Sequence, residues 1–238
     1  MEILDFFRFT PAEISILLLS LKVALFCVVL ILVPAVAIAW VLARKSFFGK
    51  SLLDSLIHLP LVMPPVVPGF LLLLVLGNQG IIGKYLHQTF GISLAFTWMG
   101  AVVASAVMAF PLMVRSVRLA ISQVDKGLEI AAQSLGAHPL RVFFSITLPL
   151  SLPGIITGLI LAFSRSMGEF GATITFVGNI ENETRTLPLA IYSYTQTPDG
   201  DMPALRLVIL SMALALGALM VSDKLERKAQ QQIGRGHD

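Results

Sequence analysis

Two oppositely charged side chains, Arg165 and Glu169, lie four residues apart inside a long apolar segment. On a helix this spacing places them side by side on one face. An Arg at the centre of a membrane span costs about 2.5–3.5 kcal/mol on insertion scales, and pairing lowers that cost. One interpretation is therefore a structural ion pair. The other is that Arg165 lines a route for an anion and Glu169 limits its field, because a free Arg would hold an anion too tightly to release it.

The sequence lacks the residue patterns of nucleotide binding, metal binding and enzyme catalysis. A phosphate-binding loop needs G-x-x-x-x-G-K-[ST] after a strand. Gly49-Lys50-Ser51 supplies only the end of that motif, and Arg44 occupies its first glycine position. The one cysteine, Cys27, lies in an apolar run, and no Cys/His set has the spacing of metal ligands. The sequence predicts no catalytic residue, metal or cofactor in this chain.

The composition predicts a membrane protein. Of its 238 residues, 56% are hydrophobic and 13% are charged, whereas an ordinary soluble domain has about 25% charged residues. A helix crosses a bilayer core about 30 Å thick with about 20 apolar residues. Five windows meet this requirement, at residues 14–43, 52–76, 94–114, 150–176 and 205–222. We expect an all-α integral membrane protein with about five transmembrane helices.

Basic residues are divided unevenly between the predicted connections. Eleven Lys and Arg residues lie in alternate connections and the C-terminal segment, against five on the other side. The positive-inside tendency then predicts an N-terminus outside and a C-terminus in the cytoplasm. In this orientation, residues 1–14 form an extracytoplasmic segment, and residues 223–238 form a polar, frayed cytoplasmic tail. The first apolar run is too long for a cleaved signal peptide, so we expect an uncleaved anchor.

The connection between the third and fourth windows has the pattern of two short amphipathic helices. The first has an apolar face at helical spacing, made by Leu128, Ala131, Ala132 and Leu135. Gly136 is placed to end it in the left-handed conformation, and Pro139 suits the first turn of the second helix. The second helix has an expected stripe of Leu140, Phe143, Phe144 and Thr147. Such helices either lie flat among lipid headgroups or dock on a cytoplasmic protein, and the pattern alone favours neither.

The same connection resembles the E-A-A-x-x-x-G-x(9)-I-x-L-P signature of the membrane permeases of bacterial ABC importers. Ile130 occupies the family's Glu position, and Glu129 comes one residue earlier. In that family the loop is a coupling helix seated in a groove of the ATPase. The resemblance implies that role for about residues 126–147, and the displaced glutamate leaves its own partner open. The implied coupling residues are Leu128, Glu129, Ala131, Ala132, Gln133, Leu135, Gly136, Phe143, Ile146, Leu148 and Pro149.

Three further stretches are similar to oxyanion permeases for molybdate and sulfate: GEFGATITFVGN (168–179), RTLPLAIY (185–192) and LPLVMPPVVPGFLLLLVLGNQGIIG (59–83). The last resembles molybdate permeases more than sulfate permeases. The resemblance covers about residues 15–222, which implies one ABC type-1 permease domain and the type I importer fold. It implies molybdate as the cargo, with sulfate or tungstate as alternatives. We expect the substrate pathway at Arg165, Gly168, Glu169, Phe170, Gly171, Pro64 and Pro65.

Prolines 60, 64, 65 and 68 crowd the second window. Each removes a backbone donor that hydrocarbon cannot replace. Two interpretations remain: a simple kink, or a segment that lines a cavity.

Five helices are few to enclose an oxyanion path, so we expect a two-fold dimer of this chain. The resemblance adds two cytoplasmic ABC ATPases and an extracytoplasmic molybdate-binding protein that docks on residues 78–97 and 180–204. Transport would proceed by alternating access across the bacterial inner membrane. Rival classes are an ATP-independent channel or secondary transporter, and a membrane scaffold without cargo.

Overall fold

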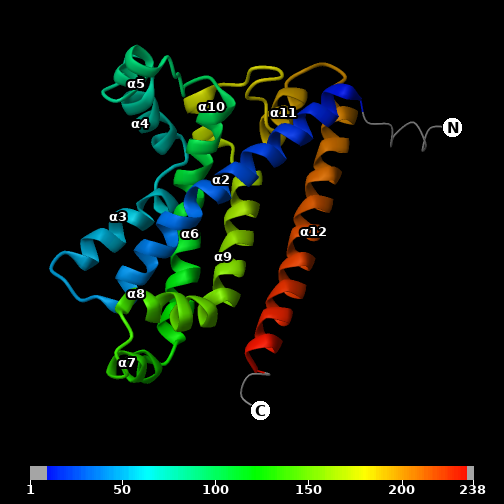
Figure 1. Cartoon of the computed structure of the whole chain (residues 1–238). Helices are drawn as coiled ribbons and strands as arrows, with labels where there is room; N and C mark the ends of the chain where they lie inside the picture. The colour runs from blue at the N-terminus through cyan, green and yellow to red at the C-terminus, as the bar shows by residue number, and fades with distance from the viewer. Residues whose placement is uncertain (1–9, 235–238) are drawn as a thin grey trace.

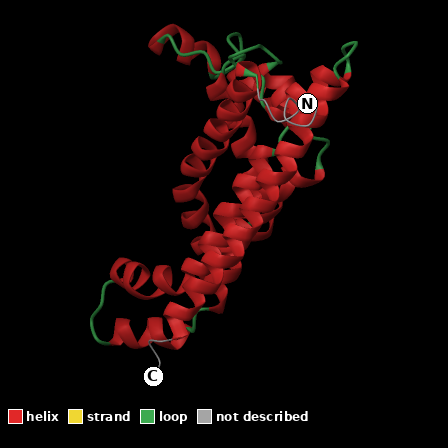
Figure 2. Ribbon diagram, turned by 90° about the vertical axis from the view of Figure 1, so that its right-hand side faces the viewer, coloured by secondary structure: helices red, strands yellow, loops and turns green. Residues whose placement is uncertain are grey.

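The computed structural model describes residues 10–234, and no strand occurs among them (Figure 2). Four helical segments are long and apolar enough to cross a membrane. They are α2 (Pro11–Arg44), α6 (Trp98–Gln123), the run from α8 (Pro139–Val142) through the π-helical turn η1 (Phe143–Thr147) into α9 (Leu148–Met167), and α12 (Asp201–Gly234). The start of α2 and the end of α12 lie at opposite ends of the bundle (Figure 1).

The second predicted span is not one straight helix. It is divided into α3 (Lys50–Val62) and α4 (Val66–Leu76), which meet at an angle of 112°. Met63 is extended, with φ −72° and ψ 148°, as expected before a proline. Pro64 and Pro65 follow it and cannot donate to the preceding turn. The prolines therefore produce a sharp break, and the pair counts as a fifth crossing only if both helices belong to one span.

The fourth predicted span is also shorter than its apolar window. α9 ends at Met167, whereas the window continues to residue 176. Its last part forms a separate short helix, α10 (Gly171–Val177), and α11 (Leu187–Thr195) follows. The break falls at Gly168, where the N–H bonds back to Ser164 at 3.3 Å and the helix stops. Hydropathy alone could not reveal this stop, because the segment beyond it remains apolar.

The core lies where α2 and α9 pack against α6. Small residues make this contact close: Ala101, Ala104 and Ala109 of α6 are fully buried. A Cβ on Gly154 of α9 would lie 2.2 Å from Cβ of Ala120, so only glycine allows this approach. The two broken segments are attached to this closely packed α2–α6–α9 core.

The remaining elements lie toward the two ends of the bundle. α5 (Gly83–Phe90), α10 and α11 gather at the end where α2 begins, and α7 (Lys126–Ser134) lies at the other (Figure 1). α12 continues helically to Gly234, into the segment predicted as a frayed tail. Residues 1–9 of the predicted N-terminal segment and 235–238 of the tail lie outside the described residues.

Candidate functional site

The two helix breaks pack against each other. A Cβ on Gly171, at the start of α10, would lie 2.5 Å from Cβ of Pro65. One turn into α4, a Cβ on Gly69 would lie 2.6 Å from the carbonyl oxygen of Ala172. The structure thus brings together two predicted pathway residues, Pro65 and Gly171, that are 106 positions apart. Pro64 is exposed beside them.

The ion pair predicted at the end of α9 is present. Nη1 of Arg165 lies 2.7 Å from Oε2 of Glu169, whose side chain is 1% exposed. The other carboxylate oxygen accepts the backbone N–H of Ala172 at 2.7 Å. Glu169 therefore ties the end of α9 to the first turn of α10, where a negative charge is favourable. Arg165 keeps 26% of its side chain exposed, so it can also meet an ion from one side.

The other predicted pathway residues flank this break. The ring of Phe170 packs on Tyr192 of α11, with centroids 5.2 Å apart. Gly168 lines a cavity of about 210 Å³ between α9, α11 and α12. Two hydroxyl residues, Ser164 and Ser211, line the same cavity. Sequence reasoning missed these serines, because a single hydroxyl in an apolar run carries no spacing signal.

The predicted helix–stop–helix connection is present at the opposite end of the bundle. Gly136 has φ +88°, in the left-handed region, and the N–H of Ala137 bonds back to Ala132 at 3.0 Å. Pro139 occupies the first turn of α8, and His138 caps it by accepting the N–H of Leu140. We call α7, α8 and η1 together the hairpin. Glycine takes this φ without strain, and among the other residues asparagine tolerates it best, so Gly136 sets the turn.

α7 turns its polar side toward its own chain and its apolar side outward. Lys126, Glu129 and Gln133 line a cavity against the end of α2 and the start of α8. Leu128 and Leu135 are 47% and 90% exposed. Ala131 is also exposed, and Ala132 is half-buried. A soluble amphipathic helix does the reverse, so the apolar side of α7 is available to another surface.

The stripe expected on the second helix is only partly present, because its four residues lie on two different sides. Leu140 and Phe144 are 63% and 61% exposed, whereas Thr147 is buried. The cause is η1, since a π-helical turn rotates the residues after it relative to α-helical spacing.

The structure also places the other predicted coupling residues. Phe143 packs edge-on against Trp40, Ile146 is half-buried, Leu148 packs on the main core, and Pro149 is exposed.

Glu129 has its partners within the chain. Its Oε2 lies 3.0 Å from Nε of Arg44, the last residue of α2. Its Oε1 accepts from Nη2 of Arg44 at 3.0 Å and from the hydroxyl of Thr147 at 2.5 Å. Arg44 also donates to the carbonyl of Val124 at 2.9 Å. This network joins α2, α7 and η1, and sequence reasoning had assigned neither Arg44 nor Thr147 to it.

Comparison with known proteins identifies the family of this chain. The family model described as "Binding-protein-dependent transport system inner membrane component" matches residues 35–231. The chain belongs to this family. It is therefore a multi-pass inner-membrane transport component and not an ATPase.

Curated relatives of this permease span nearly its whole length. It is 56% identical over 226 residues to the "Molybdenum transport system permease protein ModB" of Escherichia coli (strain K12), covering 95% of this chain and 99% of the relative. The protein of the same name from Haemophilus influenzae is 55% identical, with 94% and 98% covered. A "Probable sulfate transport system permease protein cysT" of Chlorokybus atmophyticus is 38% identical, with 87% and 72% covered.

Solved structures share the fold of this permease. A bacterial ABC transporter involved in the import of the acidic polysaccharide alginate matches with a TM-score of 0.74 at 16% identity, covering 95% of this chain and 82% of that one. An amino acid ABC transporter matches with a TM-score of 0.64 at 23% identity, covering 94% and 97%. The expected ABC importer permease architecture is thereby confirmed.

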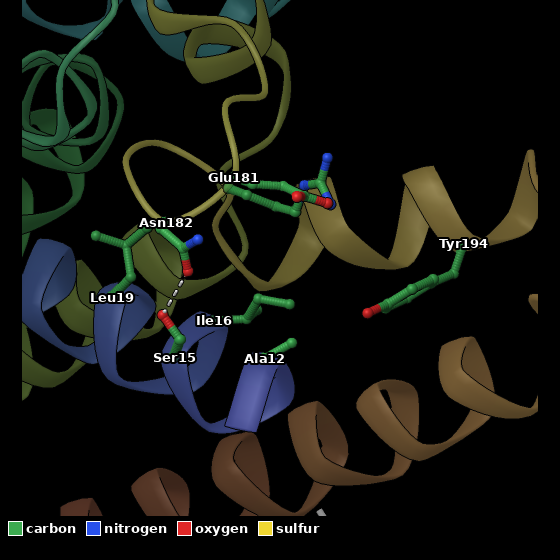
Figure 3. A pocket seen from close by; sticks show the side chains of 8 residues that line it. Ala12, Ser15, Ile16, Leu19, Glu181, Asn182 and Tyr194 are labelled. Carbon is green, nitrogen blue, oxygen red and sulfur yellow. Dashed lines mark hydrogen bonds and ion pairs between the residues drawn. The ribbon is translucent and has the colours of Figure 1, made fainter. Parts of the chain in front are cut away.

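At the end opposite the hairpin, the permease has a small cavity of about 90 Å³ between α2 and the loop before α11 (Figure 3). Arg185 pairs there with Glu181, and Ser15 donates to Asn182 at 3.4 Å. Nearby, the buried carboxylate of Glu13 lies 2.8 Å from Nε of Arg206 and joins α2 to α12. Both of these arginines are therefore paired with carboxylates of the chain.

Proposed function

We propose that this permease is the translocating subunit of an ATP-driven importer that carries molybdate across the bacterial inner membrane. Its relatives support the cargo. Two proteins named for molybdenum transport are 55% and 56% identical over nearly their full length, against 38% for a sulfate permease. Tungstate resembles molybdate in charge and shape, so it stands beside sulfate as an alternative cargo.

The observation that carries the transport mechanism is the outward apolar side of α7. Leu128 and Leu135 are exposed on a helix that the Glu129–Arg44 ion pair holds against α2. A helix fixed on its polar side and apolar on the other fits a hydrophobic groove in a partner protein. We infer that the partner is the ABC ATPase, and that the hairpin passes the movement of the ATPase to α2 and α9.

The assembly would contain two copies of this chain, two ATPases and an extracytoplasmic binding protein. None of the residues of α3 is buried in the single chain, and a second copy packed along α3 would cover its apolar side chains. ATP and magnesium would be held by the ATPases, and this chain would hold no cofactor. The uneven distribution of Lys and Arg supports a cytoplasmic hairpin and an extracytoplasmic start of α2.

The pathway would pass the junction of the two helix breaks. Alternating access needs an element with two arrangements, and the α3–α4 and α9–α10 breaks are the points where the bundle can bend. Arg165 would draw the oxyanion toward the junction, while Glu169 would keep it from binding too tightly to leave. The binding protein would deliver its anion at the extracytoplasmic end of the bundle, which residues 78–97 and 180–204 form.

Uptake into vesicles tests this function. The complete transporter is reconstituted with its binding protein, and radioactive molybdate uptake is measured with ATP inside and with molybdate, tungstate or sulfate as unlabelled competitor. We expect ATP-dependent uptake that molybdate and tungstate suppress and sulfate does not. Suppression by sulfate at equal concentration would show that sulfate is recognised as well as molybdate and would contradict the proposed selectivity. Uptake without ATP, together with no ATPase in a mild-detergent preparation, would favour the channel or secondary transporter.

A further inference from the structure

A second polar cavity lies outside the proposed pathway, between the end of α2 and the hairpin. Its volume is about 320 Å³. One wall is formed by Trp40 and Arg44 of α2 with Lys45 just after it, and the other by the inward side of α7 and the start of α8. The proposed mechanism uses the Glu129–Arg44 pair in one wall of this cavity, but it assigns no ligand to the space itself.

The lining carries an excess of positive charge. Arg44, Lys45 and Lys126 face one carboxylate, that of Glu129. Arg44 and the hydroxyl of Thr147 already engage this carboxylate. Lys45 and Lys126 are exposed and have no acidic partner among the side chains that the structure describes. Nη1 of Arg44 is buried without a hydrogen-bond partner. An anion between the two lysines would balance this charge.

The other lining residues indicate which anion. Trp40 and Phe143 form an edge-to-face pair, with centroids 5.9 Å apart, and Ile130, Pro139 and Val142 complete an apolar side. A free inorganic ion gains nothing from such a wall. A molecule with a phosphate at one end and hydrocarbon at the other fits both halves of the cavity.

The position of the cavity matches the headgroup layer. The apolar run of α2 ends at Arg44, so Lys45 begins the polar connection. Trp40 lies one turn earlier, and its ring is 5.4 Å from Nζ of Lys45. Tryptophan followed by Lys and Arg is the arrangement that membrane helices show where hydrocarbon gives way to headgroups.

We propose that this cavity binds the phosphate of an anionic phospholipid from the adjoining leaflet, with Lys45 and Lys126 as its ligands. The phosphate links the end of α2 to the first turn of α7, and the Glu129–Arg44 pair already links the same two helices. The bound lipid therefore holds the hairpin in its docking position. The lipid site does not depend on the proposed function. Only the effect of the lipid on the docking position of the hairpin rests on the proposed function.

Lipid retention tests the site. The complete transporter is placed in nanodiscs of phosphatidylcholine with a minor fraction of phosphatidylglycerol, released into mild detergent, and its bound lipids are counted by native mass spectrometry. The variant is Lys45→Gln with Lys126→Gln. The matched control, Lys84→Gln with Lys224→Gln, removes two charges outside the cavity. We expect about tenfold less phosphatidylglycerol on the variant, no change on the control, and no retained phosphatidylcholine.

Three results would overturn the proposal. Equal retention of phosphatidylglycerol by the variant and the control would show that the two lysines do not form a lipid site. Displacement of the lipid by millimolar inorganic phosphate would show a free-oxyanion site instead. Loss of the ATPase from the variant, with lipid retention unchanged, would show that an acidic side chain of the ATPase fills the cavity. The measurement uses neither ATP nor molybdate, so its failure is distinguishable from failure of the proposed function.

Discussion

Glu129 lies 3.0 Å from Nε of Arg44, a residue 85 positions earlier in the chain. The pair is nearly closed to solvent, with 14% of the Glu129 side chain and 8% of the Arg44 side chain exposed. It fixes α7 to the end of the first long helix and leaves the apolar side of α7 free. The glutamate that stands one residue away from the family signature thus has an internal structural partner.

The first prediction concerns this pair. Glu129→Gln leaves the guanidinium of Arg44 buried without its counter-charge, and breaking a buried pair costs about 3–5 kcal/mol. We expect a lower unfolding temperature in detergent and weaker ATPase association. A double-mutant cycle with Arg44→Gln, followed by thermal unfolding, should give a coupling of about 1–2 kcal/mol. Additive effects of the two substitutions would contradict the pairing.

Gly136 provides a second test. A Cβ there would meet nothing within 4 Å, so the only obstacle is its φ of +88°. Non-glycine residues in this region cost about 1–2 kcal/mol, and β-branched ones more. Gly136→Val should reduce ATP-dependent uptake about tenfold while membrane levels, measured by immunoblot, stay normal. Asparagine tolerates this conformation, so Gly136→Asn should keep most uptake. Full uptake by the valine variant would argue against a coupling hairpin.

The two roles of Arg165 can be separated. Arg165→Met leaves Glu169 buried and unpaired, so folded yield should fall several-fold. Arg165→Met with Glu169→Gln removes both charges and keeps an acceptor for the N–H of Ala172, which should restore the yield measured by size-exclusion chromatography. We expect molybdate uptake by this double variant to remain low. Recovery of uptake along with yield would make the pair purely structural.

The junction of the helix breaks gives a fourth prediction. Gly171→Ala places a Cβ 2.5 Å from Pro65, so α4 and α10 must separate. A Cβ on Gly168, three residues earlier, would have only a carbonyl oxygen at 3.8 Å. We expect Gly171→Ala to lower uptake at least about fivefold and Gly168→Ala to leave it near the wild-type rate. Equal rates for both would show that the junction need not stay closely packed.

Features set by local chemistry were predictable from the sequence. Long apolar runs predicted the membrane helices, because transfer of apolar side chains into hydrocarbon depends on composition. Gly136 and Pro139 marked the turn of the hairpin, because backbone preference belongs to single residues. A spacing of four residues predicted the Arg165–Glu169 pair, which is present although α9 ends between the two. The resemblance to oxyanion permeases was carried by short motifs and agrees with the relatives.

The tertiary structure alone decided how these parts meet. Helical periodicity separated a polar from an apolar side of α7, but only the contact with Arg44 determined that the polar side faces inward. Hydropathy could not distinguish a straight span from one bent by 112°, since it averages composition along the sequence and carries no information on backbone direction. The closeness of Pro65 and Gly171 depends on how two distant segments pack on the α2–α6–α9 core. Single-residue preferences are readable in any sequence, whereas contacts between distant residues exist only after the helices have packed.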